Sequence, residues 1–402
     1  MRILQISTMS GSGSVGHIAV DLYNTIIKND HECLICYGRG TAPTNVNTFR
    51  FNNKSDVYYH AVMTRLTDKT GFYSVTATRR LINGIEKFKP DIIHLHCLHG
   101  YYINIEILFN YLKKSEIPVI WTMHDCWPFT GHCAYFDYVK CDKWKTGCFN
   151  CPQIKSFPSS IKDNSEWNYE IKRELFTSLK NLTIVTPSKW LAKLVKQSFL
   201  KVHDVKVINN GIDLEKFRPT ESSFRDKHKL KDKFVILGVA SIWDRRKGLS
   251  DFIKLSKMLG TEYRIVVVGV TNDQKKKLPK NIIGIAKTNN VEELIKIYSA
   301  SDVFLNTTYE DNFPTTNIES LACGTPIITY DTGGSAESIN EKCGVKVARG
   351  NINELLCSIK DMRKQKKLSE DCTIRAKAFD RTLRYKEYLN LYEEVLLNEK
   401  DN

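Results

Sequence analysis

The stretch over residues 301–335 constrains the fold of this chain more than any other part of the sequence. A short apolar run predicts a buried strand, and the acidic pair Glu310 and Asp311 follows it. Pro314 suits the first turn of a helix, because its missing N–H needs no partner there. We therefore expect a strand, an acidic loop, a helix over Thr315–Cys323 and then a second buried strand.

The loop before this helix suits a ligand that carries both a phosphate and a sugar. Backbone N–H groups at a helix N-terminus, together with the helix dipole, favour a phosphate. The two carboxylates beside it cannot bind an anion, but they can accept hydrogen bonds from sugar hydroxyls. A surface acidic loop in an ordinary α/β protein is the alternative.

The same stretch resembles a known family. The spacing Asp311-x7-Glu319, followed by SLACGTPII and TGGSAE, is similar to the E-x7-E region of retaining GT-B glycosyltransferases in glycosyltransferase family 4. The resemblance implies that the first acid contacts the donor sugar, that loop amides hold the diphosphate and that Glu319 holds the ribose. Asp311 stands where the family has Glu, so the neighbouring Glu310 is a second candidate for the sugar contact. The loop residues concerned are Asn312, Phe313, Pro314 and Thr315.

Length and composition bound the class of protein. A length of 402 residues predicts two domains, and a hydrophobic content of 42% is enough for two cores. No apolar run reaches the roughly 18 residues of a membrane-spanning helix, and the first residues enter a strand rather than a signal peptide. We therefore expect a cytoplasmic protein with reduced cysteines. The net charge of +14 indicates an anionic partner, for which a nucleotide, a membrane surface and a nucleic acid are the candidates.

A loop rich in glycine and serine over residues 9–17 follows the first strand, and a helix is expected from about Ile18. Such a loop lets a ligand approach the backbone closely. Its glycines have the G-x-G-x-x-G spacing, but no acid follows at the distance typical of dinucleotide-binding folds. In the resembled family this loop faces the donor diphosphate or the acceptor, and we take Gly13 as the phosphate-binding residue. A plain flexible turn is the alternative.

Two buried strands of the first half, Pro90–His96 and Pro118–Thr122, end at polar residues, where α/β proteins place their sites. His124 follows the second strand and matches the active-site His of the resembled family, which implies a contact with the donor sugar. His96 is the competing candidate, with a structural or acceptor-side role.

Residues 55–89 are helical in outline and combine basic with aromatic and aliphatic side chains. Basic and apolar residues on one helical surface suit anionic lipid headgroups. Members of the resembled family often act on lipid-linked acceptors, so we expect peripheral contact with the inner face of a membrane. A solvated basic face is the alternative.

Four cysteines lie close together in an insert over residues 126–152: Cys133, Cys141, Cys148 and Cys151. The C-x2-C pair can bind one metal ion tetrahedrally, the other two cysteines can complete the site, and His132 is a replacement ligand. Thiolates favour zinc over calcium or magnesium, which predicts a structural zinc ion. A subset of the resembled family has a similar Cys-rich insert. An iron–sulfur cluster, disulfides and ordinary packing of reduced thiols stay open.

The second half of the chain restarts with a strand over Phe234–Ala240, and a basic turn follows it. The turn holds Arg245, Arg246 and Lys247, an arrangement that suits a diphosphate. In the resembled family an Arg and, five residues on, a Lys hold the donor diphosphate. Lys247 matches, whereas the Arg position is Ile242, so we expect Arg245 or Arg246 to replace it. A solvated basic turn is the alternative.

The string over residues 207–219 resembles the family's crossing between domains. We expect an N-terminal Rossmann-like acceptor-side domain over 1–205, a C-terminal nucleotide-sugar donor-binding domain over 206–380, and a C-terminal helix over 381–402 that packs back on the first domain. The fold class is therefore α/β, with two Rossmann-like domains facing across a cleft, as in GT-B enzymes.

These features predict a retaining, hexosyltransferase-like glycosyltransferase of bacterial surface polysaccharide, exopolysaccharide or lipopolysaccharide synthesis. Its donor would be a nucleotide-diphosphate sugar and its acceptor a glycan or lipid-linked glycan, with no nucleic acid as partner. No D-x-D motif occurs, so we expect no metal cofactor in catalysis. A GT-B nucleotide-sugar epimerase is one alternative. A zinc-stapled basic module that binds nucleic acid in a salt-dependent way is a more distant one.

Overall fold

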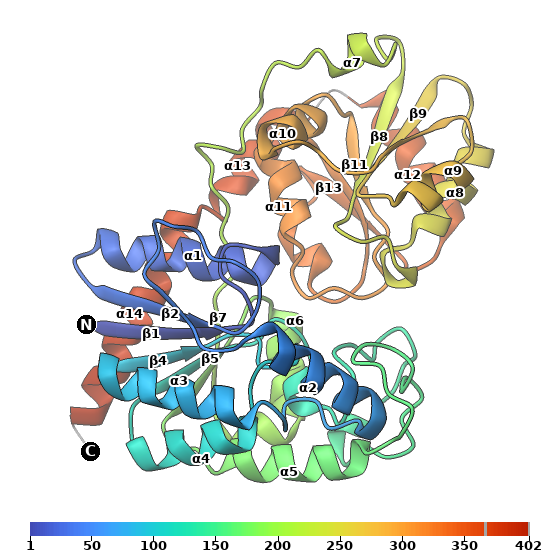
Figure 1. Cartoon of the computed structure of the whole chain (residues 1–402). Coiled ribbons are helices and arrows are strands. Elements are labelled where there is room, and N and C mark those ends of the chain that lie inside the picture. The colour runs from blue at the N-terminus through green and yellow to red at the C-terminus, as the bar shows by residue number, and fades with distance from the viewer. Residues whose placement is uncertain (366–367, 401–402) are drawn as a thin grey trace. The chain divides into compact units, whose positions relative to one another are not determined.

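The computed structural model describes residues 1–365 and 368–400, and its chain forms two α/β units (Figure 1). One unit consists of residues 1–209 together with the chain from Arg384 onward, and the other of residues 210–383. Each unit is built on a single sheet whose neighbouring strands are all parallel. The predicted α/β class with two Rossmann-like domains is confirmed.

The sheet of the first unit has the order β3-β2-β1-β4-β5-β6-β7. Its strands, in that order, are Thr48–Arg50, Glu32–Tyr37, Arg2–Ser7, Ile92–Leu95, Val119–Thr122, Leu182–Thr186 and Asp204–Val207. The order reverses between β1 and β4. In open parallel sheets, ligands bind outside the carboxyl ends of the strands at this kind of reversal.

The sheet of the second unit repeats the pattern, with the order β10-β9-β8-β11-β12-β13. Its strands, in that order, are Ile282–Ile285, Tyr263–Val268, Phe234–Val239, Val303–Asn306, Ile327–Tyr330 and Gly344–Val347. The reversal here lies between β8 and β11, so the loops after these two strands meet at one edge of the sheet.

Helices connect the strands. The first unit has α1 (Gly13–Lys28), α2 (Lys54–Thr67), α3 (Val75–Phe88), α4 (Ile105–Ser115), α5 (Ser165–Thr177), α6 (Lys189–Gln197) and the short 3-10 helices η1 (Trp127–Phe129), η2 (Lys143–Lys145) and η3 (Phe199–Val202). The second unit has α7 (Phe224–Lys227), η4 (Arg245–Lys247), α8 (Leu249–Met258), α9 (Asn272–Lys277), α10 (Val291–Ser299), α11 (Thr315–Ala322), η5 (Ser335–Ser338), α12 (Ile352–Lys364) and α13 (Ser369–Lys377). The helix α14 (Arg381–Lys400) follows.

Side chains of the first sheet alternate between two buried cores, as expected for a parallel sheet covered on both faces. In β1, Leu4 and Ile6 join one core and Ile3 joins the other. The second of these cores is completed by Tyr388 and Tyr392 of α14. The part of this helix from Arg384 onward therefore packs as a layer of the first unit.

Three expectations need correction. The first unit continues to Asn209, because β7 pairs with β6, so a domain boundary at 205/206 would cut through β7. The helix expected from Ile18 begins at Gly13, because Ser12 already occupies its N-cap position. Residues 55–89 form two helices, because the backbone turns at Asp68 (φ 61°) and again before Val75. Of the expected C-terminal segment 381–402, residues 401–402 lie outside the described residues.

Among the described helices, none combines the length and the apolar composition that crossing a bilayer requires.

Candidate active site

Two loops of the second unit meet at the sheet reversal, one after β8 and one after β11. Tyr309 N–H donates to the carbonyl of Arg246 (2.7 Å), and the guanidinium of Arg246 donates from Nη1 to the carbonyl of Glu310 (2.6 Å). The hydroxyl of Thr307 donates to the carbonyl of Lys247 (3.1 Å). These hydrogen bonds hold the basic turn against the acidic loop. The two loops are neighbours because they follow the carboxyl ends of two adjacent strands.

An ion pair lies at the centre of this arrangement. Lys247 Nζ is 2.5 Å from Asp311 Oδ2. The Lys247 side chain is 22% exposed to solvent, and the Asp311 side chain is 15% exposed. Burial alone would raise the pKa of Asp311, but Lys247 and Arg246 hold that pKa below its usual value. Asp311 is therefore a carboxylate at neutral pH, and Lys247 is oriented toward the same edge of the sheet.

The two acids of the loop differ in their surroundings. Glu310 is buried, and Arg246 and the Thr308 hydroxyl both donate to its backbone carbonyl. Asp311 is part-buried and accepts from Lys247 and from the backbone N–H of Asn312 (2.9 Å). The carboxylate of Asp311 is thus held by a cation, and Glu310 is buried. Because neither environment singles out one acid, both stay candidates for the sugar contact.

Gly248 makes the close approach of the two loops possible. Its φ is +73°, and a Cβ at this position would lie 2.3 Å from the carbonyl oxygen of Thr307. Any side chain here would push the basic turn away from the acidic loop.

A buried polar network positions α11, whose first turn follows the acidic loop. The amide of Asn317 accepts from Asn306 at the end of β11 (2.8 Å) and donates to Ser335 and Ser338 (3.0 Å to each of the Ser335 carbonyl and the Ser338 hydroxyl). Because every bond of this buried amide is made, the network ties β11, α11 and η5 together without leaving an unsatisfied group.

Glu319 lies on α11 and accepts a hydrogen bond from the hydroxyl of buried Tyr298 (3.0 Å). Burial raises the pKa of Glu319, while hydrogen bonds from Tyr298 and Thr315 partly offset that rise. The hydrogen bond from the Tyr298 hydroxyl holds the Glu319 carboxylate in one orientation. A carboxylate that contacts a ribose needs such a fixed orientation.

The loop residues predicted to hold the donor separate into backbone and side-chain roles. Phe313 is 4% exposed, and its ring packs against Phe379, so only its backbone is available to a ligand. The N–H of Asn312 is occupied by Asp311. Pro314 occupies the N-cap of α11, and Thr315 begins the helix.

The basic turn is the one-turn helix η4. Arg245 is exposed, Arg246 and Lys247 are part-buried, and Ile242, at the family's Arg position, is 69% exposed. Arg246 and Lys247 are therefore the cations that the structure brings to the acidic loop.

In the first unit, Gly13 opens α1 directly after the loop that follows β1. Apart from its chain neighbours, no heavy atom of the described residues lies within 4 Å of the position that its Cβ would occupy, and the first turn of α1 carries no acid. The backbone N–H groups of a helix N-terminus without an acid are suited to an anion.

Three histidines stack at the carboxyl ends of β4 and β5. The ring centroids of His94 and His96 are 4.3 Å apart, and those of His96 and His124 are 5.6 Å apart. Burial lowers the pKa of all three, that of His124 to about 4. These rings are therefore neutral at physiological pH and act through hydrogen bonds.

The hydrogen bonds of Gln5 fix which nitrogen of His124 carries the proton. The Nε2 of Gln5 donates to the carbonyl of Ala19 (3.1 Å), so its Oε1 accepts from Nε2 of His96 (2.9 Å). The Nδ1 of neutral His96 is then an acceptor, and Nε2 of His124 donates to it (3.3 Å). The Nδ1 of His124 is left unprotonated, which lets it accept a hydrogen bond from a substrate hydroxyl.

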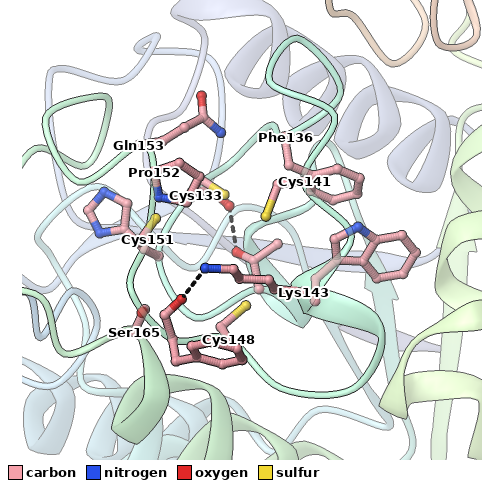
Figure 2. Close-up of a pocket in the computed structure, with 13 residues that line it drawn as sticks. Cys133, Phe136, Cys141, Lys143, Cys148, Cys151, Pro152, Gln153 and Ser165 are labelled. Carbon is pink, nitrogen blue, oxygen red and sulfur yellow. Dashed lines mark hydrogen bonds between the residues drawn. The ribbon is translucent and has the colours of Figure 1, made fainter.

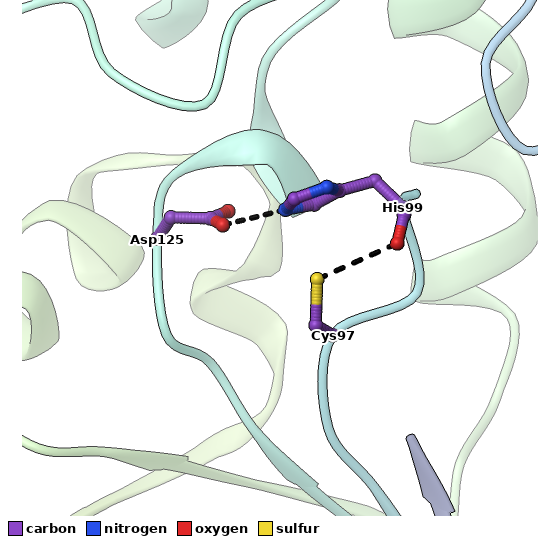
Figure 3. A group of neighbouring side chains, drawn as sticks. All are labelled: Cys97, His99 and Asp125. Carbon is purple, nitrogen blue, oxygen red and sulfur yellow. Dashed lines mark hydrogen bonds and ion pairs between the residues drawn. The ribbon is translucent and has the colours of Figure 1, made fainter. Parts of the chain in front are cut away.

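A further group, Cys97, His99 and Asp125, lies beside these histidines and was missed from the sequence (Figure 3). His99 Nε2 is 2.6 Å from Asp125 Oδ2, and one ligand atom from each of the three residues lies within 4.8 Å of the others. Burial lowers the pKa of His99, but Cys97 and Asp125 together raise it well above its usual value. One feature of the sequence could have revealed this group: Cys97-x-His99 and Asp125 follow two strands that are neighbours in the sheet.

This trio has the atom types of a divalent metal site, yet its geometry is that of an ion pair. The imidazole nitrogen that faces Asp125 already bonds to the carboxylate, and the pKa of Asp125 is lowered mainly by His99 against the effect of burial. A metal ion bound here would have to displace the imidazolium proton and break the pair with Asp125.

The four cysteines of the insert surround a separate cavity of the first unit (Figure 2). Cys133 is buried, and Cys141, Cys148 and Cys151 are part-buried. His132 lines the same cavity.

Two family models match this chain. The family model described as "Glycosyltransferase Family 4" matches residues 15–216, and the model described as "Glycosyl transferases group 1" matches residues 220–379. WcaC of Escherichia coli K12, which carries the name of a colanic acid biosynthesis glycosyl transferase, is 22% identical over 377 residues, 89% of each chain.

A second relative and a solved structure extend the comparison. The N,N'-diacetylbacillosaminyl-diphospho-undecaprenol alpha-1,3-N-acetylgalactosaminyltransferase of Campylobacter jejuni is 22% identical over 223 residues, 52% of this chain and 59% of its own. HepE of Anabaena, solved in complex with UDP-glucose, aligns over 98% of this chain and 100% of its own with a TM-score of 0.68 and 13% identity, which shows a shared fold.

The His99–Asp125 pair should make stability depend on pH. A raised His pKa stabilises the fold fully below the unfolded value of about 6.5 and less as pH rises through the folded value. A lowered Asp pKa stabilises it above about 3.9 and less as pH falls. We expect Asp125→Asn to lower the Tm most between about pH 4 and 6.5, by the equivalent of about 1–2 kcal/mol, and less at alkaline pH.

Differential scanning fluorimetry of wild type and variant from pH 5 to 10 measures this difference. Asp142→Asn, in an exposed ion pair with Lys145, is the control and should leave the Tm nearly unchanged at every pH. A Tm difference for Asp125→Asn that grows toward alkaline pH would contradict the assignment.

Proposed function

Because this chain belongs to glycosyltransferase family 4 and is a glycosyltransferase, we propose that it transfers a sugar from a nucleotide-diphosphate sugar to an acceptor hydroxyl with retention of anomeric configuration. The observation that carries the proposal is the Lys247–Asp311 pair at the β8/β11 reversal. A cation and a carboxylate fixed side by side match a donor that presents a diphosphate next to a sugar. The UDP-glucose complex of HepE supports a donor of this class.

Lys247 and Arg246 would bind the diphosphate, and the first turn of α11 would add backbone N–H groups. Negative charge develops on the departing phosphate as the bond from C1 of the sugar breaks. Lys247 is already oriented by Asp311, so it stabilises this charge without reorganising. Asp311 or Glu310 would accept hydrogen bonds from the sugar, and Glu319 from the ribose.

Retention would follow from attack on the face that the phosphate leaves. The acceptor oxygen forms the new bond to C1, and its proton passes to an oxygen of the departing phosphate. This scheme needs no protein nucleophile. In the first unit, the unprotonated Nδ1 of His124 would orient a substrate by accepting a hydrogen bond from one of its hydroxyls.

The acceptor that we propose is a growing glycan, free or lipid-linked, in surface polysaccharide synthesis. WcaC supports a polysaccharide, and the Campylobacter enzyme, whose name specifies an undecaprenol-linked sugar, supports a lipid-linked acceptor. Work on such a substrate would bring the enzyme to the inner face of a membrane.

The helix α2 offers a surface for that contact. Its exposed face carries Tyr58 (74% exposed), Tyr59, Val62 and Leu66. Spacings of four residues place Tyr58, Val62 and Leu66 on one stripe. Exposed basic side chains lie on α2 and α3, at Lys54, Arg65, Arg79, Arg80 and Lys87. Aromatic and apolar groups flanked by cations suit an anionic lipid surface.

The proposed function is tested by a screen of UDP-, GDP-, ADP- and dTDP-sugars. Thermal shift identifies the donor, and NMR of the anomeric proton in the product reports retention or inversion. Stabilisation by one nucleotide sugar and a product with the donor's configuration are expected. A free, altered sugar nucleotide formed without acceptor would instead identify an epimerase. A product with inverted anomeric configuration would contradict the proposed mechanism.

We expect Lys247→Ala to lower kcat/KM by about 10²–10³-fold, because it removes the preorganised charge at the leaving group. Steady-state kinetics with the identified donor measure this change. Lys276→Ala, on the exposed face of α9, is the matched control and should retain the wild-type rate. Turnover of Lys247→Ala within about threefold of wild type would remove Lys247 from the site.

We expect Leu66→Glu to weaken binding to vesicles of 30% phosphatidylglycerol by about tenfold, through lost apolar contact and added repulsion. Vesicle co-sedimentation measures this at two salt concentrations. Ile374→Glu, an exposed apolar position on α13, is the control and should bind like wild type. Equal binding of the three proteins would exclude α2 as the contact surface.

A further inference from the structure

The segment that connects β5 to α5 has little regular secondary structure to stabilise its conformation. Residues 123–164 contain only the single-turn helices η1 and η2. Connections this long without secondary structure are uncommon in compact domains. Stacking of Phe136 on Trp144, with ring centroids 4.8 Å apart, forms a small apolar centre within the segment.

The four cysteines of this segment surround one cavity, and their sulfur atoms gather around the same space in Figure 2. The cavity measures about 20 Å³, which is room for a single ion or water. All four cysteines are free thiols. Four soft ligands around a space for one small occupant are typical of a bound transition metal.

The turn between Cys148 and Cys151 is shaped to present both sulfurs. Asn150 adopts a left-handed conformation (φ 45°), and Lys143 Nζ donates to the carbonyls of Phe149 (2.8 Å) and Asn150 (3.0 Å). The turn is thereby fixed from the neighbouring η2 helix rather than from within the C-x2-C sequence.

The backbone at Gly131 approaches Cys148 closely. A Cβ on Gly131 would lie 2.7 Å from Cβ of Cys148 and 2.1 Å from the carbonyl oxygen of Ser165, so only glycine permits this approach. The chain just before Cys133 is thereby packed against the turn that carries Cys148.

His132 provides a second, independent observation. Its Nδ1 bonds to the carboxylate of Asp68, and the side chain is fully buried at the cavity. A carboxylate on one ring nitrogen is the usual support of a metal-ligating histidine, so His132 is the alternative to a fourth cysteine ligand.

We propose that Cys133, Cys141, Cys148 and Cys151 bind one structural zinc ion. Four sulfur ligands close the coordination shell and leave no open position for catalysis.

The ion would fix the segment that begins at the histidine stack. The N–H of Trp127 donates to Asp125 Oδ1 (2.9 Å), and that of Cys126 donates to the carbonyl of Ala134 (2.9 Å), next to Cys133. The metal would thus stabilise the conformation of residues that follow His124, without contacting substrate itself.

The test is the metal content of the untagged full-length chain, purified without chelators and measured by inductively coupled plasma mass spectrometry. About one zinc per chain is expected. Protein that is metal-free after zinc supplementation, or that carries iron in place of zinc, would overturn the proposal. So would fewer than the 12 free thiols of the sequence after denaturation, since a disulfide would occupy the ligands.

X-ray absorption at the zinc edge then assigns the ligands in wild-type protein. Four sulfurs at about 2.3 Å are expected. Three sulfurs and one nitrogen would overturn the four-cysteine shell and indicate His132 as the fourth ligand. Neither measurement uses transferase activity, so a negative result here leaves the proposed function standing, and the reverse also holds.

Variants complete the test. Cys148→Ser and Cys151→Ser should each lower the zinc content at least tenfold and lower the Tm. Cys357→Ser, an exposed cysteine on α12, is the matched control and should retain full zinc. Where a ligand variant fails to fold, the wild-type metal content and absorption spectrum still decide the question.

Discussion

Parallel pairing of strands is the constraint on which the rest of this structure depends. In each sheet the strand order reverses once, between β1 and β4 and between β8 and β11. Loops that leave the carboxyl ends of these strands must then lie at one edge of their sheet. The basic turn and the acidic loop are far apart in sequence, yet this rule makes them neighbours, and Gly248 then lets Lys247 reach Asp311.

The two sites are electrostatically different for physical reasons. In the second unit, charges are paired and part-exposed, so Asp311 stays ionised. In the first unit, burial keeps His94, His96 and His124 neutral, and a separate pair, His99 and Asp125, holds the charge. A paired, part-exposed cation and a neutral hydrogen-bonding surface would both serve the function proposed above, in which one substrate group is a diphosphate and the others are hydroxyls.

Local patterns made the second unit the easier one to predict. The strand, acidic loop and helix over residues 301–335 and the basic turn at Lys247 are each encoded within a few residues. Features that depend on distant contacts were not predictable. His99 pairs with Asp125 only because β4 and β5 are neighbours. The break between α2 and α3 depends on Asp68, whose carboxylate bonds to His132 and to the backbone of Asn164. The sequence predicts Phe313 as a loop residue, but its ring packs into the core because Phe379 covers it.

Gln5 interrupts the buried apolar residues Ile3, Leu4 and Ile6 of β1, where a buried amide is costly unless it is hydrogen-bonded. Its amide group supplies a donor on one side and an acceptor on the other, and both are used. The hydrogen-bond chain from the backbone of α1 to His124 therefore has a polarity, set by a residue that need not touch substrate. Glutamine suits this position because its amide carries a donor and an acceptor at a fixed separation. A carboxylate would still accept from His96 but would lose the bond to the backbone of α1, whereas a hydrocarbon would remove both bonds and leave the proton position on His124 unset.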